Sequence, residues 1–96
     1  MVTIFATVKI QEGRMEEAIP VLQAIATSVR ESEPGVIGYI PHTVAGEGNE
    51  NTIIFYEKYE DEAAMQAHLA QLKTTLADLM PLVEPGEDIK ICTEII

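Results

Sequence analysis

Residues 52–72 read TIIFYEKYEDEAAMQAHLAQL, and the spacing of their apolar side chains changes halfway along. From Thr52 to Glu60 most residues are β-branched or aromatic, which is typical of a strand. Beyond residue 60 the apolar side chains recur at helical steps, at Met65, Leu69, Leu72, Leu76 and Leu79. Asp61 is a suitable N-cap at the junction. The stretch therefore predicts a strand that passes directly into an amphipathic helix.

The rest of the chain adds three strands and one helix. Strands are predicted at residues 2–10, 36–44 and 88–96, because β-branched and aromatic types are frequent there. Residues 45–51 are polar and rich in Gly and Asn, which indicates a hairpin connection. A helix is predicted from Arg14 until shortly before Pro34-Gly35, with apolar residues at Met15, Ala18, Ile19, Leu22, Ile25, Ala26 and Val29.

Two prolines interrupt these patterns. Pro20 falls inside the first helix, where it removes a hydrogen bond, so a kink or a late helix start is expected. Pro41 falls inside the second strand and cannot donate to a neighbour, so this strand is expected at an edge or with a bulge.

The predicted order of elements is β-α-β-β-α-β. It indicates an α+β, ferredoxin-like fold, with a four-stranded antiparallel sheet and both helices on one face. The first strand carries apolar residues on one face and Phe5 on the other, so neither face is fully polar. The face without helices would then expose apolar surface. We expect a homodimer that covers this open sheet face.

Size and charge narrow the class of protein. With 96 residues the chain has room for one domain, residues 1–96. Sixteen acidic side chains against six basic ones give a net charge of −10, which disfavours nucleic acid and anionic membranes as partners. No apolar run approaches the roughly 20 residues of a membrane span, and Cys92 is the single cysteine. A soluble cytoplasmic protein is the expectation.

His68 and Glu57 are the most informative polar residues. His68 lies three residues after Met65 and four before Leu72, on or beside the apolar stripe of the second helix. Glu57 alternates with Phe55 and Tyr59 onto one strand face, so a carboxylate and an imidazole are expected to share the interior. Such a pair can tune a general base, and it can equally be a satisfied polar pair in a core. Both interpretations stay open at this point.

Other residues are weaker candidates for a functional site. Tyr39 and His42 are three residues apart on one strand and should point to opposite faces unless a bulge near Pro41 shifts the register. The acidic residues of the second half resemble solvated loops and a helix start, so no metal site is expected. The sequence contains no phosphate loop, nucleophile elbow or dinucleotide fingerprint.

Three segments in order resemble the antibiotic biosynthesis monooxygenase domain family. They are an acidic residue followed by Pro-Gly and a tyrosine (residues 33–39), a Tyr-Glu-x-aromatic strand end (residues 54–61) and an Ala-His-Leu helix motif (residues 64–69). The resemblance extends over essentially the whole chain. It implies a dimeric α/β barrel, in which each protomer encloses a pocket between sheet and helices.

The resemblance also implies an activity: a cofactor-independent monooxygenase that oxidises an aromatic, polyketide or quinol-type molecule with O₂. The residues that match the family's pocket are His68 and Glu57 as the catalytic pair, with His68 as the base and Glu57 orienting it. Substrate-binding candidates are Tyr39, Tyr59, Phe55 and His42. The chain has no Trp, and its first strand has no Asn, so the residue set of the haem-degrading branch cannot be assembled.

Two further classes of function stay open. The scarcity of Lys and Arg disfavours a phosphorylated substrate, but an isomerase acting on a small oxygenated metabolite is an alternative. A non-catalytic, dimeric small-molecule-binding module is another. Dependence of turnover on O₂ would separate an oxygenase from an isomerase, and ligand binding without turnover would identify the module.

Overall fold

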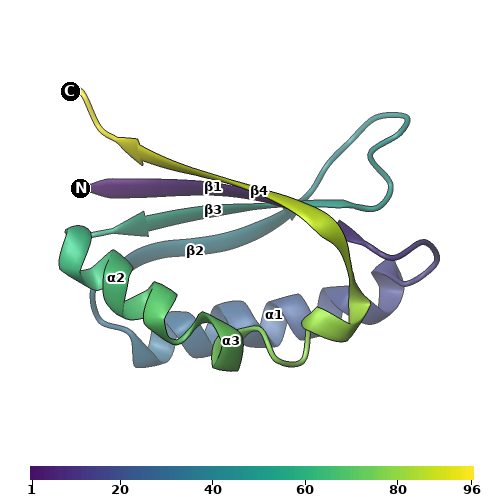
Figure 1. Cartoon of the computed structure of the whole chain (residues 1–96), viewed down its shortest axis with the longest axis horizontal. Helices are drawn as coiled ribbons and strands as arrows, with labels where there is room; N and C mark the ends of the chain where they lie inside the picture. Colours follow the sequence, from purple (N-terminus) through teal and green to yellow (C-terminus); the bar gives the residue numbers. More distant parts are fainter.

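The computed structural model describes all residues, Met1–Ile96, as one four-stranded sheet and its helices (Figure 1). The elements in chain order are β1 (Val2–Ile10), α1 (Met15–Ser32), β2 (Val36–Thr43), β3 (Thr52–Tyr59), α2 (Glu62–Ala70), α3 (Leu72–Thr75), the 3₁₀ turn η1 (Met80–Leu82) and β4 (Val83–Thr93). The strand order is β2-β3-β1-β4, and every pair is antiparallel. The predicted α+β, ferredoxin-like fold is confirmed.

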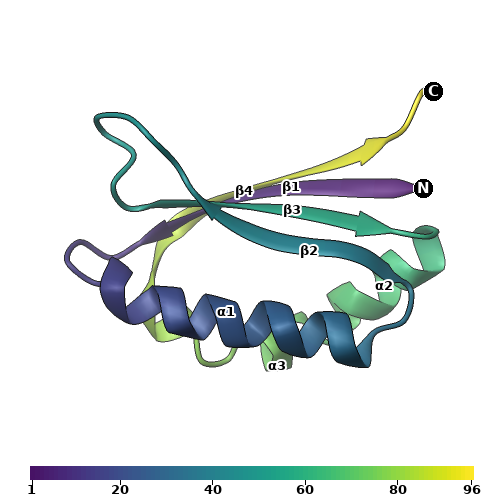
Figure 2. The same ribbon diagram turned by 180° about the vertical axis from the view of Figure 1, so that it is seen from behind.

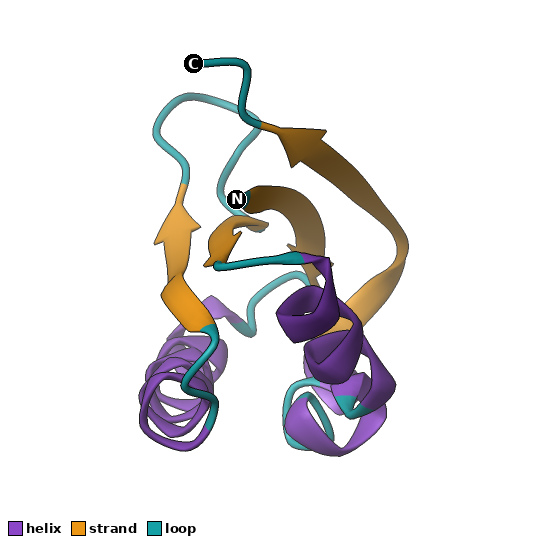
Figure 3. Ribbon diagram, turned by 90° about the vertical axis from the view of Figure 1, so that its left-hand side faces the viewer, coloured by secondary structure: helices purple, strands orange, loops and turns teal.

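All helices cover the same face of the sheet. Figure 2 shows α1 running beneath the sheet, and the end-on view of Figure 3 shows α1 beside α2 and α3 under the twisted strands. Alternation along β3 sends Phe55, Glu57 and Tyr59 to this face, where all three are buried. Phe55 and Tyr59 pack with Ile4 of β1 and Leu22 of α1 in a single core. None of the helices is long and apolar enough to cross a membrane.

The second helical segment is shorter than its apolar stripe predicts. α2 ends at Ala70, Gln71 leaves helical geometry at φ −106° and ψ 8°, and the one-turn helix α3 follows. The Gln71 N–H bonds to the His68 carbonyl, three residues back, which tightens the last turn. β-Branched Thr74 and Thr75 then give this stretch a low helix propensity. A single helix through Leu79 was therefore the wrong prediction.

The last strand begins earlier and ends earlier than predicted. β4 starts at Val83 and continues through Pro85-Gly86, a pair that ordinarily signals a turn. β4 is an edge strand, where a missing N–H is tolerated, and Gly86 takes φ +111° beside a register shift opposite Thr7 and Lys9. The strand stops at Thr93 because its partner strand β1 begins opposite it, at Val2.

The two interior prolines are accommodated differently. α1 begins at Met15, before Pro20, so the late helix start is ruled out. Pro41 lies on β2, which is the other edge of the sheet, as predicted. The register shift of β2 falls between Val36 and Gly38 rather than at Pro41, so Tyr39 and His42 do point to opposite faces.

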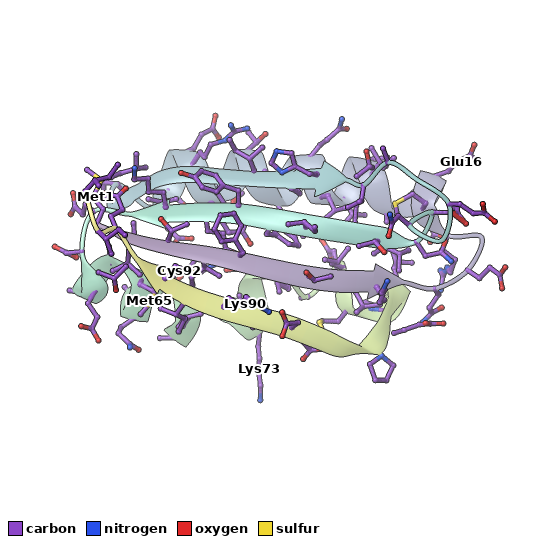
Figure 4. The ribbon with its side chains drawn as sticks, turned by 90° about the horizontal axis from the view of Figure 1, so that it is seen from above. Met1, Glu16, Met65, Lys73, Lys90 and Cys92 are labelled. Carbon is purple, nitrogen blue, oxygen red and sulfur yellow. The ribbon has the colours of Figure 1, made fainter.

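The face of the sheet opposite the helices is open (Figure 4). Phe5 of β1 is 43% exposed on it, with its ring 5.7 Å from that of Tyr56 of β3. Ile40 of β2, which pairs with Tyr56, is 42% exposed. Large apolar side chains thus lie uncovered on the side that the sequence predicts to be a dimer interface.

Candidate functional site

The His68 side chain is the centre of a buried polar cluster. α2 places it under the sheet, where it is fully buried. Its ring lies 5.2 Å from that of Tyr39 on β2 and 5.6 Å from that of Tyr59 on β3. Two strands and one helix therefore fix the imidazole, and the rings on either side keep water from it.

Glu33 is the hydrogen-bond partner of His68. Its Oε1 lies 3.0 Å from His68 Nδ1, and its side chain is 16% exposed. Because an ionised carboxylate can only accept, Nδ1 carries the proton of this bond. Glu33 is the C-cap of α1, and its carbonyl accepts from the Val36 N–H, so the turn into β2 holds it in place.

Gly35 sets how closely this turn approaches α2. A Cβ at Gly35 would lie 2.6 Å from Ala64 Cβ, closer than side chains pack. The Gly35 carbonyl also accepts from the Glu60 N–H at 3.0 Å, which ties the turn to the end of β3. The glycine is therefore needed for close approach between the two backbones, and this approach brings Glu33 to His68.

Gly35→Ala is expected to lower the free energy of unfolding by about 1–3 kcal/mol, because overpacking forces the turn away from α2. Urea denaturation would measure the change. The double variant Gly35→Ala/Ala64→Gly removes the Ala64 Cβ, which the new methyl group would overlap. It should recover more than half of the lost free energy of unfolding. A double variant as unstable as the single one would show that the contact with Ala64 is not the cause.

Glu57 is bound to Tyr59 rather than to His68. The Tyr59 hydroxyl donates to Glu57 Oε1 at 2.5 Å, whereas His68 Nε2 lies 4.0 Å from the same oxygen, beyond hydrogen-bond reach. His68 Nε2 is buried and has no partner. The prediction that Glu57 orients His68 is thus corrected, since Glu33 makes that bond.

Burial controls the protonation of the cluster. It raises the pKa of Glu57 above the ordinary value of 4.5, and the Tyr59 hydrogen bond and the nearby His68 offset part of this effect. Burial raises the pKa of Tyr39 above its usual range, with a further contribution from Glu57. It raises that of Tyr59 likewise, with its bond to Glu57 adding to the effect. Both phenols therefore stay protonated near neutral pH, and Glu57 is the carboxylate of the cluster that lines the cavity.

The raised pKa of Glu57 has a consequence for stability. The folded state holds this proton more tightly than the unfolded state, so the free energy of unfolding falls as pH rises above about 4.5 and Glu57 ionises. Glu57→Gln keeps an acceptor for Tyr59 and lacks the penalty. Its stability relative to wild type should therefore rise above pH 4.5, by at most about 1.4 kcal/mol per pH unit. Urea titrations between pH 4 and 8 test this, and a difference that does not change with pH would contradict it.

An apolar cavity of about 260 Å³ lies between the sheet and α2 and α3. Twelve of its fifteen lining residues are hydrophobic, and its charged ones are Glu57, Lys73 and Glu87. The hydrophobic ones include Ile4, Ala6, Val8, Leu69, Leu72, Leu76, Leu79 and Ile89. Beside the break at Gln71, Leu69 of α2, Leu72 of α3 and Leu76 at the C-cap of α3 line one wall.

The sequence-predicted residues divide into three groups. Glu57, Tyr39 and Phe55 line the cavity. His68 and Tyr59 do not line it and reach it through these residues, His68 by its contact with Tyr39 and Tyr59 by its bond to Glu57. His42 is exposed on the open face of the sheet and takes no part in the cluster.

Glu33 is the residue that sequence reasoning missed as a member of the site. The sequence does contain a signal for Glu33: it is the acidic residue before Pro-Gly in the first of the three segments that resemble the family. No group of three or more His, Cys, Asp or Glu side chains is arranged to hold a metal ion. What the cluster can do chemically is accept a proton at Glu57 from a molecule in the apolar cavity.

Comparison with known proteins identifies the family of the chain. The family model for antibiotic biosynthesis monooxygenases matches residues 1–73. The chain belongs to this family. The matched part includes every residue of the polar cluster, from Glu33 to His68. A search of curated proteins gives no match.

Solved structures show the same fold. A proposed antibiotic biosynthesis monooxygenase from Caulobacter crescentus is 22% identical, with a TM-score of 0.84 over 99% of this chain and 90% of that one. One from Bacteroides thetaiotaomicron is 25% identical, with a TM-score of 0.78 over 99% and 90%. A protein from Shewanella oneidensis is 26% identical, with a TM-score of 0.77 over 95% and 87%.

Proposed function

We propose that this family member is a cofactor-independent monooxygenase acting on a neutral hydroxyaromatic or quinol-type molecule. The observation that carries the proposal is one buried carboxylate, Glu57, in the wall of an otherwise apolar cavity. An apolar cavity of about 150 Å³ can hold benzene, so one of 260 Å³ has room for a bicyclic compound. A largely apolar wall with one buried carboxylate suits a substrate that becomes reactive on losing a proton.

The chemistry balances without any further reductant. A substrate AH₂ loses a proton to Glu57, and the electron pair left behind forms a C–O bond with O₂. Glu57 returns the proton to the peroxide so formed. The O–O bond then breaks as the adjacent C–H proton leaves, which gives a carbonyl product and water. One AH₂ and one O₂ thus become one AO and one H₂O, and the substrate supplies all the electrons.

The charges around the cavity support a neutral substrate. Glu57 and Glu87 are acidic, and Lys73 is the one basic side chain in its lining. Figure 4 shows the Lys73 side chain extending outward, away from the sheet beyond the β4 edge. A phosphate dianion would meet two carboxylates here without a basic partner inside the cavity. In this proposal Tyr39 and Phe55 hold the substrate ring, and Tyr59 and His68 act through Glu57.

A panel of dihydroxyaromatics tests the function. Purified protein should convert at least one compound faster than buffer does in air, and removal of O₂ should stop the conversion. Turnover that continues without O₂ would indicate an isomerase instead. Ligand-induced thermal stabilisation with no turnover in air would indicate a binding module.

The proposal includes a homodimer through the open sheet face, and the predicted cytoplasmic location belongs to it as well. Phe5 and Ile40 are the apolar side chains that such an interface would bury. Ile40→Glu should weaken dimerisation at least about 30-fold, because a hot-spot substitution costs about 2 kcal/mol or more. Sedimentation would measure this, with Gln66→Glu on the exposed side of α2 as control. A monomeric wild type, or equal dimerisation of both variants, would contradict the proposed interface.

A further inference from the structure

His68 lies between two carboxylates that face different spaces. On one side Glu57 belongs to the wall of the apolar cavity. On the other side Glu33 lines a groove between α1 and α3 whose lining is largely polar and includes Ser28, Ser32, Gln71, Thr74 and Asp78. His68 itself lines neither space. The imidazole therefore lies between a largely apolar cavity and a largely polar groove, with a carboxylate of each on either side of it.

The hydrogen bond at Nδ1 determines which ring nitrogen of His68 can accept a proton. His68 Nδ1 donates its proton to Glu33, so in the neutral ring Nε2 carries a lone pair. This lone pair is buried and unpartnered, which is unfavourable for a polar atom. Glu57 Oε1 lies 4.0 Å from it. When Glu57 has taken a proton from a bound molecule, it becomes the donor that Nε2 lacks, and a movement of about 1 Å completes the bond.

We propose that Glu57, His68 and Glu33 form a proton relay between the apolar cavity and the groove beside α3. The relay rests on the proposed function, because it serves the proton that Glu57 removes from substrate. Glu57 passes that proton to His68 Nε2 and becomes a carboxylate again. His68 passes its Nδ1 proton to Glu33, which exchanges it with water in the groove.

The oxygenase reaction uses the relay in both directions. The substrate proton leaves at the start, and a proton is needed again when the peroxide forms, so no net proton is released. When a proton moves back from Glu33 through His68 to Glu57, His68 regains its Nδ1–H form at the end of each turnover. Glu33 is thus a positioning and relay residue, which never touches the substrate.

Glu33→Gln separates relay from positioning. The amide oxygen still accepts the Nδ1–H bond but cannot take the proton, and Glu33 is partly exposed, so the variant should fold. Glu31→Gln, an exposed acid on the same helix turn, is the matched control. The first readout needs no substrate. In ¹⁵N-labelled protein, exchange of the His68 ring proton with water, measured by saturation transfer, should slow by about tenfold or more in Glu33→Gln only.

The second readout uses turnover. With a substrate from the panel, Glu33→Gln should lower kcat by about tenfold or more and leave KM within about twofold, while Glu31→Gln matches wild type. Ring-proton exchange as fast in Glu33→Gln as in wild type would overturn the relay whatever the activity. Slowed exchange together with no turnover of any compound would support the relay and count against the oxygenase function alone.

Discussion

Glu57→Gln is expected to lower turnover by about 10²–10⁴-fold, because it removes the only buried carboxylate in the cavity wall. Substrate binding should change little, since glutamine has the same shape and its oxygen still accepts from the Tyr59 hydroxyl. KM should therefore stay within about threefold of wild type while kcat falls. Initial rates of substrate consumption in air, at several concentrations, separate the two parameters.

The matched control is Glu47→Gln, an acid in the exposed hairpin between β2 and β3. It makes the same chemical change far from the cavity and should keep the wild-type rate. Loss of activity in both variants would point to a general effect of charge. A Glu57→Gln variant that retains a third or more of the wild-type kcat would show that the proton goes elsewhere.

His68→Ala is expected to lower the free energy of unfolding by about 2–5 kcal/mol, or Tm by roughly 10–25 °C for a chain of this size. The fully buried ring fills the space between Tyr39 and Tyr59, and its removal leaves a cavity there. It also takes away the hydrogen bond to Glu33. Thermal and urea denaturation, followed by circular dichroism, measure both effects.

His42→Ala provides the comparison within the same chain. His42 is exposed on the open sheet face of the protomer, so at protein concentrations low enough to keep the chain monomeric its loss should change stability by no more than about 0.5 kcal/mol. Similar small losses for both histidine variants would contradict the packing role of His68. A large loss for His68→Ala alone would confirm that the imidazole belongs to the core as well as to the polar cluster.

Local patterns were enough to predict the fold and the inward side chains. Alternation along β3 placed Glu57 with Phe55 and Tyr59, and helical spacing placed His68 toward the sheet. The N-cap role of Asp61 is confirmed by its bond from the Ala64 N–H. These features depend on periods of two and 3.6 residues, which a short stretch of sequence already contains.

Most of the features that sequence reasoning missed depend on contacts between distant segments. Glu33 and His68 are 35 residues apart, and only the close approach at Gly35 brings them together. The strand through Pro85-Gly86 forms because an edge position and a bulge tolerate residues that locally favour a turn. The helix break at Gln71 was hidden because the apolar stripe continues across it. The first two features depend on tertiary contacts, whereas the third was missed because the apolar stripe outweighed the low helix propensity of Thr74 and Thr75.

The most direct test of the central claim is the stoichiometry of oxygen consumption. Chelator-treated protein and an active hydroxyaromatic would be followed with an oxygen electrode and by product analysis, with ¹⁸O₂ as the label. We expect one O₂ consumed per substrate, one labelled oxygen atom in the product, and a Glu57→Gln rate reduced at least about 100-fold. Product without the label, or equal rates for wild type and Glu57→Gln, would contradict it.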